Sequence, residues 1–208
     1  MILSVNTLLD SVNRCLSAIG ELPVSSLDEY NVDIGNILNT INAISTTLQT
    51  NQGKGWWFNT DFNVSYALND DNEIILPNNH LAESVKLDPS RYYNCSHYRV
   101  VVRGSKLYDA MNNTYDMTAM ARDERVHLEQ LVVRLEFEML PQVAKDFITA
   151  SARASFALDF ETDYKRVEVL GYEVEKSFYG IQQAELRNRK HNYINDNQSM
   201  QKLISVMR

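Results

Sequence analysis

The sequence predicts an α+β protein, in which N- and C-terminal helices form an antiparallel helical bundle and an antiparallel β-rich domain is inserted between them. Apolar residues recur at helical spacing early in the chain, alternate with polar residues from Trp56, and return to helical spacing after Pro141. We therefore expect four parts. They are an N-terminal helical pair (1–55), a β-rich domain (56–140), C-terminal helices that complete the bundle (141–190) and a polar tail, flexible or docked on a partner (191–208).

Two amphipathic helices are predicted in the first part. The first ends at Gly20 and Pro23, because glycine suits a left-handed stop and proline cannot continue the helix. The second carries a stripe of isoleucine and leucine from Ile34 to Leu48 and ends at Gly53-Lys54-Gly55. Their short connection leads us to expect antiparallel packing of the pair. The stripe of the first helix consists of Val5, Leu8, Leu9, Val12, Leu16 and Ile19.

The central part is predicted to form short strands. Apolar and polar residues alternate from Phe62 to Leu68, which is typical of a strand with one buried face. A strand over Glu73–Leu76 is stopped by Pro77, and Val85 and Leu87 mark another.

The clearest hairpin lies between Tyr98 and Tyr108. Gly104-Ser105 fits a two-residue type II′ turn, because glycine takes a positive φ at the first central position. The polar segment Met111–Arg125 is expected to be an irregular loop. Beyond it, alternation from Leu131 to Met139 predicts a strand with one buried and one solvated face.

Two more helices are predicted after Pro141, since proline fits the first helical turn. The first presents a face of mostly small residues, through which another helix can approach closely. The second runs from about Thr162 to about Arg189, with Tyr164 to Ile181 supplying one apolar side. The tail from Asn192 has only a weak apolar stripe. The face of the first of these helices consists of Val143, Phe147, Ala150, Ala154 and Leu158, and the tail stripe of Met200, Leu203, Ile204 and Met207.

Composition excludes several classes of protein. The 208 residues are 44% apolar, enough to bury a core and too many for a disordered chain. No apolar run approaches the roughly 20 residues that span a bilayer, so no membrane insertion is expected. The N-terminal stretch lacks a basic region before its apolar residues and is interpreted as a helix, not a signal peptide. Cys15 and Cys95 make no disulfide framework, which favours a reduced compartment.

The charge balance argues against general nucleic-acid binding. Lys and Arg number 20 against 27 Asp and Glu, a net charge of −7, whereas a protein that grips phosphates needs a basic stripe. The densest basic stretch, Arg187–His191, ends a predicted helix, where cations complement the helix dipole. DNA near this protein is expected to slide past and not be held.

The spacings that catalysis requires are missing from the sequence. There is no phosphate-binding glycine loop, dinucleotide fingerprint or nucleophile elbow. The four histidines are scattered without the spacing of metal ligands. We therefore expect no enzyme activity, no cofactor and no metal, and we assign no catalytic, cofactor-binding or metal-binding residue. The histidines are His80, His97, His127 and His191.

Paired carboxylates offer one alternative. Glu136 and Glu138 share a face of the predicted strand, and two such groups serve glycoside hydrolysis in other proteins. Arg134 lies on the same face, however, and alternation already explains all three as the solvent side. Asp70-Asp71 fits a turn, and Asp123-Glu124 fits a solvated charge run.

A cluster of aromatic residues allows two interpretations. Trp56, Trp57 and Phe58 either stack on bases or sugars or anchor a core shared by helix and strand. We favour the core, because aromatic side chains bury a large apolar area.

The order of these features resembles the tail tubular protein A family, the head-to-tail adaptors of short-tailed podovirus phages. The resemblance covers roughly Val5 to Gln183 and rests on the order and spacing of five segments. These are Ile19-Gly20-Glu21-Leu22-Pro23-Val24, Gly55-Trp56-Trp57-Phe58-Asn59, Ile75-Leu76-Pro77, Arg103-Gly104-Ser105-Lys106-Leu107-Tyr108-Asp109 and Phe137-Glu138-Met139-Leu140-Pro141.

The resemblance implies a structural protein of the virion tail, assembled in the host cytoplasm. It implies a ring of twelve subunits that joins the portal protein to the tail nozzle protein and forms part of the DNA ejection channel. Double-stranded DNA would pass through the lumen without specific binding. Candidate contact surfaces are the polar strand faces and the Met111–Arg125 loop. The Asn192–Arg208 tail is expected to be disordered alone and to dock on the portal or a neighbour.

Two other functions remain open at this point. A tail-associated carbohydrate-binding or glycoside-hydrolysing protein would need a cleft with an exposed Trp56 or Trp57, and Glu136→Gln should abolish its turnover. A small binding module unrelated to phages would stay monomeric and ignore a portal ring.

Overall fold

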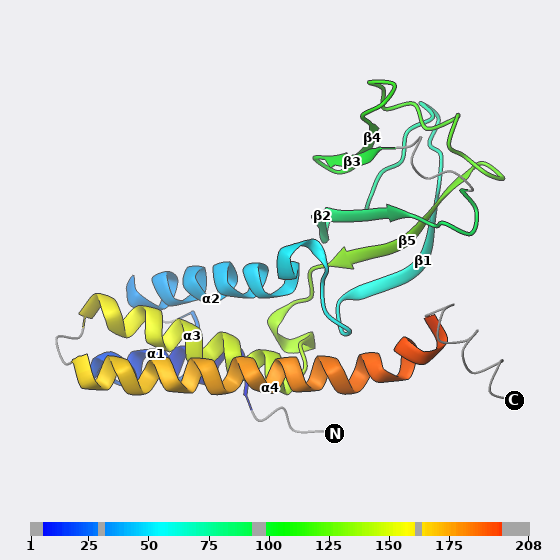
Figure 1. Cartoon of the computed structure of the whole chain (residues 1–208). Coiled ribbons are helices and arrows are strands. Elements are labelled where there is room, and N and C mark those ends of the chain that lie inside the picture. Colours follow the sequence, from blue (N-terminus) through cyan, green and yellow to red (C-terminus); the bar gives the residue numbers. More distant parts are fainter. Residues whose placement is uncertain (1–5, 29–31, 93–98, 161–163, 197–208) are drawn as a thin grey trace, which may run out of the picture. The chain divides into compact units, whose positions relative to one another are not determined.

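The computed structural model describes residues 6–28, 32–92, 99–160 and 164–196 and has the expected α+β fold (Figure 1). The chain divides into two compact units. One consists of Met1–Ser45 and Glu136–Arg208, and the other of Thr46–Leu135. We refer to them as the helical unit and the β unit. No helix among the described residues is both long enough and apolar enough to cross a membrane.

The helical unit contains α1 (Leu8–Ile19), most of α2 (Val32–Thr50), α3 (Gln142–Phe160) and α4 (Tyr164–Asp196). Helix α3 packs against both α1 and α4 (Figure 1). We expected the first two helices to pack antiparallel as a pair and to form the bundle with the C-terminal helices, and the main partner of α1 is the C-terminal helix α3. Buried side chains line these contacts, namely Val12, Cys15 and Leu16 of α1, Ala144, Ile148 and Ala152 of α3, and Leu170 and Ile181 of α4.

Both ends of α1 follow from local hydrogen bonding. Thr7 and Asp10 form a capping box, in which each side chain accepts a hydrogen bond from the other residue's backbone N–H. At the other end Gly20 has φ +85°, and the next N–H, of Glu21, donates to the carbonyl of Leu16. The stop predicted at Gly20 is confirmed.

The later helices depart from prediction in two respects. Leu158 was expected on the packed face of α3 but is 60% exposed. The fully buried Ala144, Ile148 and Ala152 lie one or two positions after the predicted residues. Packing on two sides explains this, because α3 contacts α1 as well as α4. Helix α4 also runs beyond the predicted end near Arg189, to Asp196. The rest of the predicted tail lies outside the described residues.

The β unit holds a three-stranded antiparallel sheet and a separate hairpin. The sheet has the order β1 (Thr60–Ala67), β5 (Arg125–Val133), β2 (His80–Leu87). The hairpin pairs β3 (Val100–Arg103) with β4 (Lys106–Asp109), and Gly104 has φ +63° in the turn, as predicted. Their shared core includes Ile74, Leu76, Tyr92, Leu107, Met117, Met120, Val126, Leu128, Leu131 and Val133.

Two predicted strands differ from the structure: one is absent and the other ends early. Glu73–Leu76 forms no strand, although its alternation is real: Ile74 and Leu76 are buried and Ile75 is 51% exposed. The one β-type pairing of this segment is the bridge between Ile75 and Lys106, beside the hairpin.

The strand predicted up to Met139 ends instead at Val133, and Phe137–Met139 form a 3₁₀ turn. The cause is at Leu135, whose N–H and carbonyl both bond to the side chain of Gln49 and not to a neighbouring strand. The same strand begins earlier than expected, at Arg125.

Candidate functional site

Among the described residues, no group of three or more His, Cys, Asp or Glu could hold a metal ion. His80 has a structural position: its Nδ1 lies 2.7 Å from the carbonyl oxygen of Pro77 and its Nε2 lies 3.0 Å from that of Gly104. His127 lies in β5 and His191 in α4, whereas His97 falls outside the described residues. The histidines that can be placed thus lie on three different elements or loops.

The two glutamates of the hydrolase alternative do not share a strand face, because the chain there forms the 3₁₀ turn. Glu138 instead accepts a hydrogen bond from the N–H of Leu8 at 2.9 Å, at the start of α1. Its other carboxylate oxygen lies 3.4 Å from the ammonium group of Lys145, whose side chain is buried. Glu138 therefore accepts a hydrogen bond from the first turn of α1 and pairs with a buried cation, which is a structural role.

The remaining acidic pairs lie in turns. Asp123 and Glu124 have φ +55° and +60°, and the backbones of Arg122 and Arg125 exchange both of their hydrogen bonds across them. Two consecutive positive φ angles are the geometry of a tight type I′ hairpin turn. Asp70 is exposed in the turn before Ile74.

The aromatic cluster belongs to the interior of the β unit. Trp56 is 5% exposed, and its indole N–H donates to the carbonyl of Leu48. Trp57 and Phe58 are half-buried and meet edge to face with ring centres 5.0 Å apart. The core interpretation is confirmed for Trp56.

A buried amide pair joins the elements around this cluster. The Asn59 side chain accepts from the N–H of Trp56 at 2.7 Å and donates to the carbonyls of Gln49 and Val133 at 2.9 and 3.0 Å. Gln49, also buried, uses its own amide to hold both backbone groups of Leu135. Sequence reasoning missed both residues, because polar amides next to a helix end are typical of exposed turns.

The loop before β5 is anchored by its buried ends and exposes its middle. Asp109 is 1% exposed and accepts hydrogen bonds from the backbone of Met111 and from the backbone and side chain of Asn112. Met117 is fully buried, whereas Met111 is 56% exposed. The predicted loop is thus confirmed over most of its length, and part of it belongs to the core.

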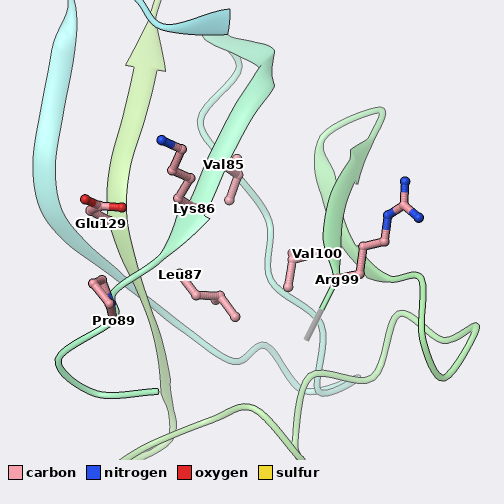
Figure 2. A pocket seen from close by; sticks show the side chains of 7 residues that line it. All are labelled: Val85, Lys86, Leu87, Pro89, Arg99, Val100 and Glu129. Atoms are coloured by element: carbon pink, nitrogen blue, oxygen red, sulfur yellow. The ribbon is translucent and has the colours of Figure 1, made fainter. Parts of the chain in front are cut away.

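A groove of about 360 Å³ lies between β2 and β3 (Figure 2). Figure 2 shows Leu87 of β2 directed toward Val100 of β3, with Val85 beside them. The lining also includes the charged residues Lys86, Glu129 and Arg99, and Figure 2 shows Arg99 directed away from Lys86 and Glu129. The groove has no convergent polar groups of the kind that fix a small ligand, and it lies along two strand edges.

The long helix α4 exposes large apolar side chains. Val169, Tyr172, Tyr179 and Leu186 are 58 to 66% exposed, although the opposite side of the same helix is packed against α3. Exposed aromatic and aliphatic side chains that lie together on a surface often mark a site of contact with another molecule. The sequence pattern gave no hint of this stripe, because only the buried side of α4 was considered.

One protein-family model matches most of the chain. A family model described as tail tubular protein matches residues 9–203, a range that includes all of the β unit and most of the helical unit. No curated protein matches the sequence significantly.

Proposed function

We propose a head-to-tail adaptor role for this chain. The chain belongs to the tail tubular protein family and is therefore a structural component of a phage tail. In the proposed role, copies of the chain form a ring, a dodecamer, between the portal protein and the tail nozzle protein of a podovirus. The lumen of that ring is part of the DNA ejection channel. Assembly takes place in the host cytoplasm.

The family match carries this proposal, because it spans both units. The polar networks of the described residues add support. The buried side chains of Asn59, Gln49 and Asp109 all bond to backbone groups, as expected of a protein whose polar interior maintains its shape. A net charge of −7 suits a channel wall, since attraction to phosphates would retard DNA during ejection.

The test is to mix the protein with the portal ring of its own virus and to image the mixture by negative-stain electron microscopy. A collar of density added to one end of the portal is the expected result. A portal ring from an unrelated virus serves as the control and should remain bare. Intact portals without a collar, in the presence of folded protein, would contradict the adaptor role.

A second measurement tests the channel wall. Binding of the assembled ring to short duplex DNA, followed by fluorescence anisotropy at low salt, should be undetectable at concentrations where a basic control protein binds. Tight binding that weakens steeply with salt would be the signature of phosphate contacts and would refute the passive channel.

A further inference from the structure

Helix α4 has two apolar sides. The inner side, with Leu170 and Ile181, is buried against the bundle. The outer stripe consists of Val169, Tyr172, Tyr179 and Leu186. With spacings of three, seven and seven residues, these side chains fall within about 100° of the helix surface, on the side away from Leu170 and Ile181, and the exposed Lys176 and Gln183 lie among them.

The stripe is built as a contact surface. It extends about 25 Å along α4, and two of its four members are tyrosines, a residue enriched at protein interfaces. The acidic groups Glu168 and Glu175 are exposed beside it, in the position of a polar rim.

The outward side of α2 has the properties of its partner. Between Ile34 and Gly53 the sequence contains no charged residue. The exposed positions of α2 within the helical unit are Val32, Gly35, Asn36, Asn39, Asn42 and Ala43. Protein surfaces usually carry roughly a quarter to a third charged residues, and interface cores lose Lys, Glu and Asp. An aromatic stripe can cover this side of α2 without removing any charge from water.

The two surfaces lie on opposite sides of one bundle. In Figure 1 the part of α2 that belongs to the helical unit and α4 run on either side of α3. A heterologous contact, which generates a ring, needs two different surfaces on each subunit facing away from each other. The outward side of α2 from Val32 to Ala43 is about 16 Å long, enough to cover Tyr172 and Tyr179, which are about 10 Å apart along α4.

We propose that the outer stripe of α4 in one copy packs on the outward side of α2 in the next copy, and that this contact links neighbours around the ring. The inference rests on the proposed ring but names the residues that join its subunits. The occupant of the stripe is thus a second copy of this chain.

Cross-linking between marked copies tests the contact directly. One variant carries Tyr179→Cys and the other Ala43→Cys, both in a Cys95→Ser background, in which the remaining native thiol of Cys15 is buried. Equal amounts of the two are mixed, with and without portal rings, and treated with a short bismaleimide. We expect a cross-linked pair joining position 179 to position 43. The matched control replaces Ala43→Cys with Ser17→Cys, an exposed position on α1, and should give no pair.

Disruption provides the second arm. Tyr172→Ser with Tyr179→Ser should leave the far-ultraviolet circular dichroism unchanged and reduce collar formation roughly a hundredfold in effective concentration, since buried tyrosines are frequent interface hot spots. Asn188→Ser, exposed on the same helix but on the side away from the stripe, should have no effect.

The outcomes separate this inference from the adaptor role. A normal collar without the 179–43 pair, or a collar unaffected by loss of both tyrosines, overturns the inference and leaves the adaptor role standing. Loss of the collar without any 179–43 pair shows that the stripe contacts the portal, which also overturns it. If wild-type protein forms no collar, the adaptor role fails, and the portal-free cross-link decides, measured at a subunit concentration and salt concentration high enough to populate a weak contact: its presence supports the α2–α4 contact and its absence refutes it.

Discussion

Replacement of Asn59 by alanine should be among the most damaging single changes in the β unit. The side chain is 1% exposed and makes three hydrogen bonds, all to backbone groups: the N–H of Trp56 and the carbonyls of Gln49 and Val133. Asn59→Ala leaves the buried N–H of Trp56 without this partner, at a cost of about 1–3 kcal/mol. Each carbonyl loses a donor, at about 0.5–1.5 kcal/mol. The sum is about 2–6 kcal/mol, a large part of the roughly 5–15 kcal/mol that stabilises a typical domain.

Urea unfolding followed by tryptophan fluorescence measures this loss. Both tryptophans of the chain, Trp56 and Trp57, lie in the β unit, so the signal reports on that unit. With a urea dependence of about 2 kcal/mol per molar, a loss of about 4 kcal/mol lowers the unfolding midpoint by about 2 M. Asn78→Ala, at an exposed position of the same unit, is the control and should stay within about 0.5 kcal/mol of wild type.

A second variant separates hydrogen bonding from size. Asn59→Asp keeps the shape and the acceptor for Trp56 but replaces the amide donor by an oxygen facing the carbonyls of Gln49 and Val133. It should be at least as destabilised as Asn59→Ala at neutral pH. The reasoning is refuted if Asn59→Ala loses less than about 1 kcal/mol, or if Asn59→Asp is as stable as wild type.

Three further changes are predicted to affect stability or reactivity. Gly55 and Gly104 have φ +61° and +63°, but a Cβ at Gly55 would collide with side chains of β1 and β5, whereas the space at Gly104 is open. Gly55→Ala should therefore cost about 3 kcal/mol or more, and Gly104→Ala only about 1–2 kcal/mol, in the same urea assay. Burial raises the pKa of the Cys15 thiol to about 12. In a Cys95→Ser variant, the native protein should therefore react with a maleimide at about pH 8 at least roughly a hundredfold more slowly than the unfolded protein. Equal rates would contradict the burial of Cys15. The capping-box hydrogen bonds lower the pKa of Asp10, so the ionised carboxylate stabilises the fold above its ordinary pKa and loses this effect as pH falls through the lowered value. Asp10→Asn should melt earlier than wild type at neutral pH and together with it in strong acid, and a pH-independent difference would exclude the carboxylate charge as the cause.

Prediction from sequence succeeded where hydrogen bonding and burial are local. The stop of α1 at Gly20 and the hairpin turn at Gly104 each depend on one residue's backbone preference, and the structure confirms both. The buried stripe of α2 was also predicted correctly, because the apolar residues from Ile34 to Leu48 recur at helical spacing within the helix itself. These features need no knowledge of distant partners.

Prediction failed where a distant residue decides the local structure. The alternation up to Met139 is as regular as that of a strand, yet the amide of Gln49, 86 residues away from Leu135, takes the backbone bonds that would continue the ladder. Glu73–Leu76 alternates correctly but finds only one bridge. Leu158 was assigned to a packed face because the pattern shows that α3 has partners but not that it has two. No pattern along the chain contains this information.

The contact surfaces were the least predictable part of the structure. They matter because the subunits carry the same net charge. Subunits with a net charge of −7 repel one another, and at physiological salt this repulsion acts over about 8 Å. A contact between neighbours must therefore be formed by groups that attract at short range and bring no additional charge. The uncharged outward side of α2 and the apolar stripe of α4 are two surfaces of the helical unit that meet this condition. Their attraction works against the repulsion of the whole subunits, so a single contact in solution is weak.

When a portal ring holds the copies in place, the contacts form between molecules that are already adjacent, and closing the ring adds a contact without further loss of freedom. The same acidic charge that suits a DNA channel would in this way also keep the free subunits from assembling before the portal is present.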